Sequence, residues 1–265
     1  MLTFADLHQS PLHFRNLPRI INAANPDVVA LVGDFLDLGI NEGRVVLTIK
    51  EVVACLSAIK PPLICVRGNH EDHNWTAFAE EWEKSGNGKE LHCLDASTYT
   101  LGPLTIVGFP CPMGDDAYWC LSLPKTGNIL NTLPKGRHSV GYQHDKWMKP
   151  LQKRLGPAGR MCWLLHIPPV GRPIAHPEAF SPWFCDLVDK YLPMLTISGH
   201  DHATPLRHST WNCKEEQTIC VNVGQGGLET FYACVDFQFE EGKILPPKIT
   251  VTAMPGDRRI EIACV

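Results

Sequence analysis

The stretch Val32-Gly33-Asp34-Phe35-Leu36-Asp37-Leu38-Gly39 decides the fold, because two carboxylates three residues apart directly follow the apolar run 27–32. A buried strand that ends in glycine and then aspartate delivers a carboxylate to the carboxyl edge of a sheet, where α/β folds bind their ligands. Asp34 is therefore a candidate metal ligand. Taken alone, the same residues also fit a turn aspartate that caps the next segment. The choice between a metal ligand and a turn aspartate depends on whether other strands of the chain end in the same way.

Apolar strands and helical patterns alternate around this stretch. A short strand at 2–5 precedes a helix that carries Leu12, Leu17, Ile20 and Ile21 and ends at Asn25-Pro26. After the strand at 27–32, a helix is predicted at 42–59, which Pro61-Pro62 would stop, and then a strand at 63–66. This βαβα order indicates an α/β fold.

The pattern continues through the second half. Trp75, Phe78, Ala79 and Trp82 have helical spacing, which we interpret as a core-facing helix surface in preference to a base-stacking surface. Two strands around a Gly-Pro turn are predicted at 99–110. Residues 111–141 are irregular, which is typical of a lid, a binding loop or disorder. Helices are then predicted at 144–155 and 180–191, and strands at 161–165, 194–197, 218–223, 231–239 and 248–253.

Composition bounds the class of protein. The 265 residues, 44% apolar and 20% charged, fit a single globular domain spanning 1–265. No apolar run is long enough to span a bilayer, and Asp6 follows too closely for a signal peptide, so we expect a cytoplasmic protein. The eleven cysteines lack a Cys-x-x-Cys pair and are expected to be free thiols, several of them buried in apolar runs: Cys65, Cys162, Cys220 and Cys234.

Charge argues against one class of partner. The net charge is −4 and no basic block occurs, which argues against a nucleic-acid-binding face. A small phosphorylated substrate remains compatible with this balance.

Metal-ligand residue types recur at the ends of five predicted strands. The endings are Asp6-x-His8, Gly33-Asp34, Gly68-Asn69-His70, His166 and Gly199-His200-x-His202. Two metal ions about 3.5–4 Å apart need a carboxylate between them and further ligands on each side. Mixed histidine, aspartate and asparagine suit Mn, Fe or Zn better than Ca. The recurrence therefore favours a dinuclear metal site over a set of unrelated turn residues.

These blocks resemble the signature of the calcineurin-like metallophosphoesterases, which is D-x-H, G-D-x-x-D, G-N-H-[DE], H and G-H-x-H in this order. The resemblance covers nearly the whole chain. It implies a four-layer α/β/β/α sandwich of two mixed sheets flanked by helices. It also implies that Asp34 bridges two metal ions, one held by Asp6, His8 and His202, the other by Asn69, His166 and His200.

The resemblance implies a function as well: a dinuclear hydrolase of phosphomonoesters or phosphodiesters with a metal-bridging hydroxide as nucleophile. His70 would stabilise the transition state and protonate the leaving oxygen. Asp37 resembles the aspartate that orients this histidine in phosphoprotein phosphatases, although it also fits a turn aspartate. The arginine that grips phosphate in those phosphatases is Leu38 here, which argues against a protein phosphatase-like enzyme.

Two further alternatives stay open. A catalytically inactive scaffold on the same fold would have no need of all seven ligands and a general acid. A nuclease would need a basic surface along which a nucleic acid could bind, and the net negative charge does not support one.

Residues outside the five blocks have weaker signals. Asn222 is expected to support a loop near the site. Arg172, His73, Lys125 and Arg137 could reach a substrate phosphate, but a solvated surface position is the simpler interpretation. The other histidines are interpreted as surface or core residues: His13, His92, His138, His144, His176 and His208.

Overall fold

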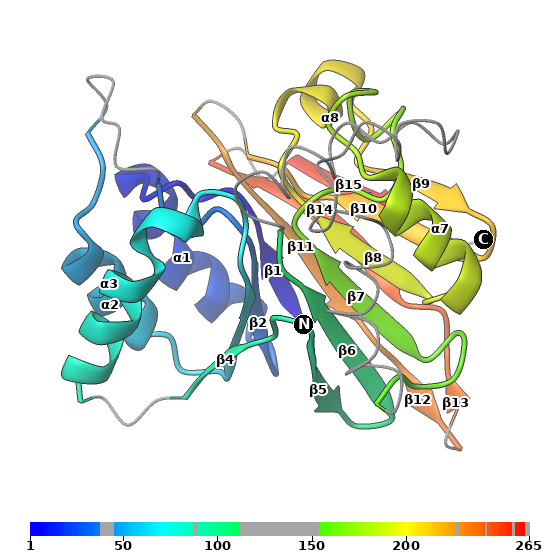
Figure 1. Ribbon diagram of the computed structural model, residues 1–265, viewed down its shortest axis with the longest axis horizontal. Coiled ribbons are helices and arrows are strands. Elements are labelled where there is room, and N and C mark those ends of the chain that lie inside the picture. Colours follow the sequence, from blue (N-terminus) through cyan, green and yellow to red (C-terminus); the bar gives the residue numbers. More distant parts are fainter. Residues whose placement is uncertain are drawn as a thin grey trace, which may run out of the picture.

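The computed structural model describes residues 1–37, 45–86, 90–111, 154–225, 228–241, 243–255 and 258–262. Within these ranges, two large mixed β-sheets lie between outer helices (Figure 1). The predicted irregular segment 111–141, apart from Cys111, falls outside the described residues, as do most of the predicted helix 144–155 and Leu38.

The first sheet, called sheet A, holds the strands that begin the chain. Four neighbouring strands are parallel, in the order β1-β2-β3-β4, and an antiparallel β11-β14-β15 extension continues the sheet from β1. Its described strands are β1 (Leu2–Phe4), β2 (Val29–Val32), β3 (Leu63–Val66), β4 (Leu91–Cys93), β11 (Thr230–Asp236), β14 (Lys248–Met254) and β15 (Arg258–Ile262).

The second sheet, called sheet B, has the order β5-β6-β7-β8-β10-β9. Its inner strands β6, β7, β8 and β10 are parallel, and the two edge strands are antiparallel to their neighbours. The strands are β5 (Ser97–Leu101), β6 (Leu104–Phe109), β7 (Met161–Leu165), β8 (Leu195–Ser198), β9 (Asn212–Glu215) and β10 (Thr218–Asn222). A small hairpin is formed by β12 (Phe239–Glu240) and β13 (Lys243–Ile244).

Three apolar clusters separate the layers. One cluster joins the two sheets and includes Val32 of β2 and Leu164 of β7. A second packs sheet A against α1 (Pro11–Ala24), α2 (Ile49–Ser57) and α3 (Glu71–Lys84), and a third packs sheet B against α7 (Pro182–Tyr191). A short helix, α8 (Ala203–His208), follows β8. Figure 1 shows α1, α2 and α3 on one side of the sheets and α7 on the other, so the predicted four-layer sandwich is confirmed.

One predicted helix was too long. The helix expected at 42–59 begins at Ile49, because Thr48 caps it: the Thr48 hydroxyl accepts from the Glu51 amide, and the Glu51 carboxylate accepts from the Thr48 amide. Residues 45–48 are not helical, and 42–44 lie outside the described residues.

Other predicted elements are close to those observed. The aromatic helix face is confirmed, with Phe78 fully buried and Trp75 and Trp82 packed against the same cluster. The cysteines among the described residues are free, and Cys234 is half-buried where a buried position was expected. No helix in the described ranges is both long and apolar enough to cross a membrane.

Candidate metal centre

The five strand endings meet where the two sheets adjoin. β1, β2 and β3 deliver Asp6, His8, Asp34, Asn69 and His70 from sheet A. β7 and β8 deliver His166, His200 and His202 from sheet B. All five strands run parallel to a neighbour in their sheet, so their carboxyl ends lie on one edge.

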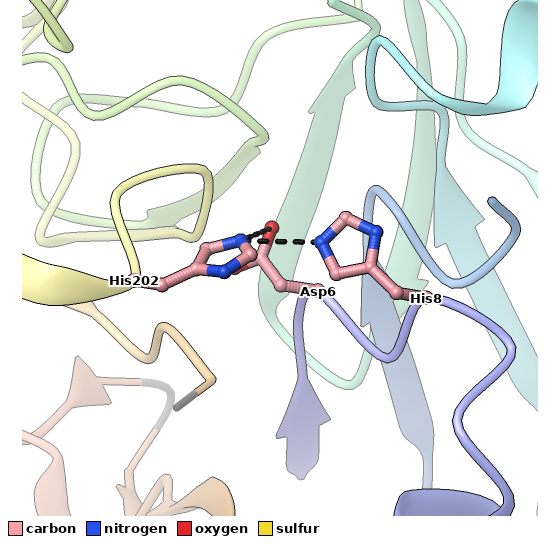
Figure 2. Close-up of side chains that lie close together, drawn as sticks. All are labelled: Asp6, His8 and His202. Atoms are coloured by element: carbon pink, nitrogen blue, oxygen red, sulfur yellow. Dashed lines mark hydrogen bonds and ion pairs between the residues drawn. The ribbon is translucent and has the colours of Figure 1, made fainter. Parts of the chain in front are cut away.

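The first group of ligand-type atoms is formed by Asp6, His8 and His202, which lie within 4.8 Å of one another. Figure 2 shows the two imidazoles facing each other beside the carboxylate. The Nε2 atoms of His8 and His202 are 3.2 Å apart, and His202 Nε2 is 3.5 Å from Asp6 Oδ1. Two ring nitrogens and a carboxylate oxygen that converge on one point suit a transition-metal ion.

The second group is formed by Asp34, His166 and His200. His166 Nε2 is 3.2 Å from Asp34 Oδ2 and 3.0 Å from the amide oxygen of Asn69. Asn69 Oδ1 is also 3.2 Å from His200 Nδ1. Since Val32 O can only accept, the Nδ1–H of His166 donates to it at 3.1 Å, which leaves Nε2 facing the other ligands.

Asp34 connects the two groups. It also forms a cluster of ligand-type atoms with His8, which belongs to the first group, and with His70. The carboxylate is buried between the two groups, a position that is compatible with a bridging ligand. The arrangement brings together all seven residues predicted as ligands.

His70 and Asp37 are also in contact. His70 Nδ1 is 3.3 Å from Asp37 Oδ1, and His70 Nε2 is 3.6 Å from Asp34 Oδ2. Asp37 is itself held: its amide donates to Gln9 Oε1, and its carbonyl accepts from Asn74. These backbone contacts from Gln9 and Asn74 were not predicted, because they depend on tertiary structure.

Burial and the nearby carboxylates act in opposite directions on the pKa values of the imidazoles. Burial lowers the pKa of His8 and of His200 to about 4, so both rings are neutral near pH 7, as a metal ligand must be. Burial alone would also lower the pKa of His166, but the Asp34 and Asp6 carboxylates raise it to about 10. Conversely, burial would raise the pKa of Asp34, but His166 and His70 hold it well below its usual value.

The backbone at the centre is strained. Asp6, His8, Asp34 and His200 all have positive φ, between 44° and 67°, which non-glycine residues rarely adopt. Such strain clusters at functional sites. The neighbouring glycines allow close approach: a Cβ added to Gly68 would lie 2.1 Å from Asp34 Oδ1, and one added to Gly199 would lie 2.4 Å from Asp6 Oδ2.

Glu71 holds the loops after β2 and β3 together. Its fully buried carboxylate accepts from the amides of Asp34, Leu36 and Gly68 at 2.8, 2.8 and 2.6 Å. Burial and the Asp34 charge raise the pKa of Glu71 to about 8, whereas the amide donors favour its ionised form. The glutamate stands in the predicted G-N-H-[DE] block, but the sequence did not indicate that it ties two ligand loops together.

Asn222 and Asp201 hold the loops on the sheet B side. The Asn222 amide donates to the carbonyls of Ile174 and Asp201, which agrees with the expected supporting role. Asp201 accepts from the amides of Ala203 and Thr204, at the start of α8, and from that of His176.

A pocket of about 730 Å³ opens over the ligand residues. Besides six of the seven predicted ligands, His70 and Asp37, it is lined by Ser10, His13, Val45, Val46 and Gln225. His166, the seventh ligand, is fully buried behind them. Of the four residues weighed as phosphate contacts, Arg172 is exposed and does not line this pocket, and the side chains of the other three lie outside the described residues.

The fold, with a cluster of ligand-type side chains between its two sheets, fits the metal-dependent phosphoesterases as a class. The sequence matches the family model of the calcineurin-like phosphoesterases over residues 2–204. The chain therefore belongs to this family.

Solved structures of low identity share the fold. A dimetal phosphatase from Danio rerio and the protein TT1561 of Thermus thermophilus are each 12% identical, with a TM-score of 0.61, over 100% of this chain and 98% of theirs. The calcineurin-like phosphoesterase YfkN from Bacillus subtilis is 12% identical, with a TM-score of 0.52, over 96% of this chain and 90% of that one. No curated protein matches the chain.

Proposed function

We propose that the protein is a dinuclear metal-dependent hydrolase of phosphomonoesters or phosphodiesters with a small phosphorylated substrate. The observation that carries this proposal is the position of Asp34, whose carboxylate is shared between two clusters of ligand-type atoms. The donor set of imidazole, carboxylate and amide oxygen, without a thiolate, fits Mn, Fe or Zn. Asp6, His8 and His202 would hold one ion, Asn69, His166 and His200 the other, and Asp34 both.

The bound ions would polarise the phosphoryl group and activate the attacking water near neutral pH. The protein would then supply the proton for the leaving group. His70 lines the pocket, and in its doubly protonated form it would donate Nδ1–H to the Asp37 carboxylate and give the proton on Nε2 to the leaving oxygen. Asp37, held by Gln9 and Asn74, would fix the orientation of this ring.

Turnover of generic substrates tests the proposal. The purified protein, loaded with Mn²⁺, Fe or Zn²⁺, is incubated with an aryl phosphate monoester and the matching diester. We expect hydrolysis of at least one ester with at least one metal. A lack of turnover with every metal would contradict the proposed activity.

Metal content separates this enzyme from the inactive scaffold. We expect two ions per chain by elemental analysis after loading and desalting. A ratio well below two would support the scaffold. The cytoplasmic location expected from the sequence stays a prediction, compatible with the free thiols.

A further inference from the structure

His13 and Ser10 line the pocket without belonging to the metal centre. They lie one helical turn apart at the start of α1, and both face the same cavity as Asp6, His8 and His202. His13 is only 7% exposed, so its polar atoms need partners inside the protein or in the pocket.

A hydrogen-bond chain assigns the proton of His13. Asn16 Nδ2 donates to the hydroxyl of Thr230 at 2.9 Å, and that hydroxyl is 3.0 Å from His13 Nδ1. Thr230 is fully buried, and among its hydrogen-bond partners in the described part of the chain only His13 Nδ1 can accept its proton, because the Asn16 amide is a donor. The Nδ1 atom of His13 is therefore an acceptor, and Nε2 carries the ring proton.

That proton is directed to the pocket. His13 Nε2 makes no hydrogen bond with a described residue, and the ring lines the cavity. Burial, with smaller effects of His8 and His202, lowers the pKa of His13 to about 4, so the ring is a neutral donor.

Ser10 offers a second neutral donor. It is the N-cap residue of α1, yet its side chain makes no capping hydrogen bond. Its hydroxyl therefore remains available on the same wall. Val46, half-buried, and Val45, exposed, add apolar surface to the pocket lining.

We propose that Ser10 and His13 form a subsite for the organic group of the substrate, and that this group carries uncharged oxygens such as hydroxyls. The proposal rests on the proposed phosphoesterase function and adds the substrate class, a phosphate ester of a hydroxylated alcohol. Neutral donors match uncharged oxygens, whereas a charged phosphoryl oxygen is bound most strongly by cationic groups or metal ions. The small apolar surface suits the carbon skeleton of such a group.

Calorimetry with two phosphonates tests the subsite without turnover. The Mn²⁺-loaded protein is titrated with 2,3-dihydroxypropylphosphonate and with propylphosphonate, which have the same length and charge. We expect the dihydroxypropyl compound to bind roughly five- to tenfold more tightly, as one or two neutral hydrogen bonds would give. Equal affinities of the wild-type protein would overturn the subsite proposal.

Variants test which side chains cause the tighter binding of the dihydroxypropyl compound. His13→Ala is expected to abolish most of it, and His13→Gln to retain part of it, because the glutamine amide can place a donor near the position of Nε2. Thr230→Val should also weaken the preference, since it removes the hydroxyl that fixes the tautomer. Exposed His208→Ala is the matched control and should leave both affinities unchanged.

The remaining outcomes are also decisive. If His13→Ala weakens both phosphonates equally, His13 contacts the phosphoryl group or is only structural, and the proposal is wrong. If His13→Ala does not fold, Ser10→Ala at the half-buried cap gives the same test. If the wild-type protein binds neither phosphonate, the phosphoester site itself fails, which is a different result from the loss of preference alone.

Discussion

His70 is the residue on which the proposed chemistry depends most directly, because it is the proposed proton donor to the leaving oxygen. We expect His70→Ala to lower kcat by about 10²–10⁴-fold while the metal content stays unchanged. Asp37→Asn should lower kcat only partly, since it weakens the orientation of the ring. Steady-state kinetics with an aryl phosphate and elemental analysis measure both effects. Full activity of Asp37→Asn would remove Asp37 from the mechanism.

Glu71 is a second residue with a testable role, because its carboxylate accepts hydrogen bonds from three backbone amides. Glu71→Gln leaves one carbonyl oxygen and one amide group opposite three N–H donors, so at least one buried donor loses its acceptor. We expect a loss of about 1–3 kcal/mol in the free energy of unfolding and weaker metal binding. Urea unfolding and a metal titration measure these changes. Exposed Glu80→Gln is the control, and an equal effect of the two substitutions would contradict the role given to Glu71.

The loops that follow the strands must approach one another closely to bring the ligand-type residues together. Gly199→Ala would place a Cβ 2.4 Å from the Asp6 carboxylate and 2.6 Å from Ala5 Cβ, so the loop after β8 would have to move away from β1. We therefore expect this variant to bind metal poorly while it remains folded. In Gly156→Ala, the nearest atom is the Thr105 hydroxyl at 3.0 Å, and metal binding should persist. Elemental analysis and circular dichroism distinguish the two variants.

At the scale of the whole molecule, metal binding is coupled to protons. In the metal-free protein His166 is protonated near neutral pH, because Asp34 and Asp6 raise its pKa to about 10. A metal ligand must be unprotonated, so metal binding by His166 as proposed would release this proton. We therefore expect metal affinity to rise with pH, by roughly tenfold per unit through the neutral range for one released proton. Calorimetry in buffers of different ionisation enthalpy counts the protons, and none released would contradict the assignment.

Much of the architecture was predictable because its signals are local. Buried parallel strands read as continuous apolar runs, and a polar ending marks the carboxyl edge of its sheet, so Asp34 and His166 could each be placed at a strand end from the sequence. That the two sheets bring these residues together was implied only by the family resemblance. The short strands β4 and β9 were missed, since neither carries a continuous buried run. The start of α2 could have been read from Thr48 and Glu51, whose spacing is a capping box.

The supporting groups could not be predicted in the same way. Glu71 and Gln9 act on amides that are distant in sequence, and helical spacing does not say which cavity His13 faces. Such contacts are specified only when the layers pack. Helical and strand periods fix which face of an element is buried, but not the partner of one polar atom on that face.

The proposed ligands are spread along the chain from Asp6 after β1 to His202 after β8, and they follow strands of both sheets. A chain leaving the ribosome could therefore complete neither proposed ligand set until His202 had been synthesised and sheet B had docked on sheet A. Metal uptake would then be a late event in biogenesis. The ratio of metal to protein in a preparation would accordingly count the chains in which both halves have assembled.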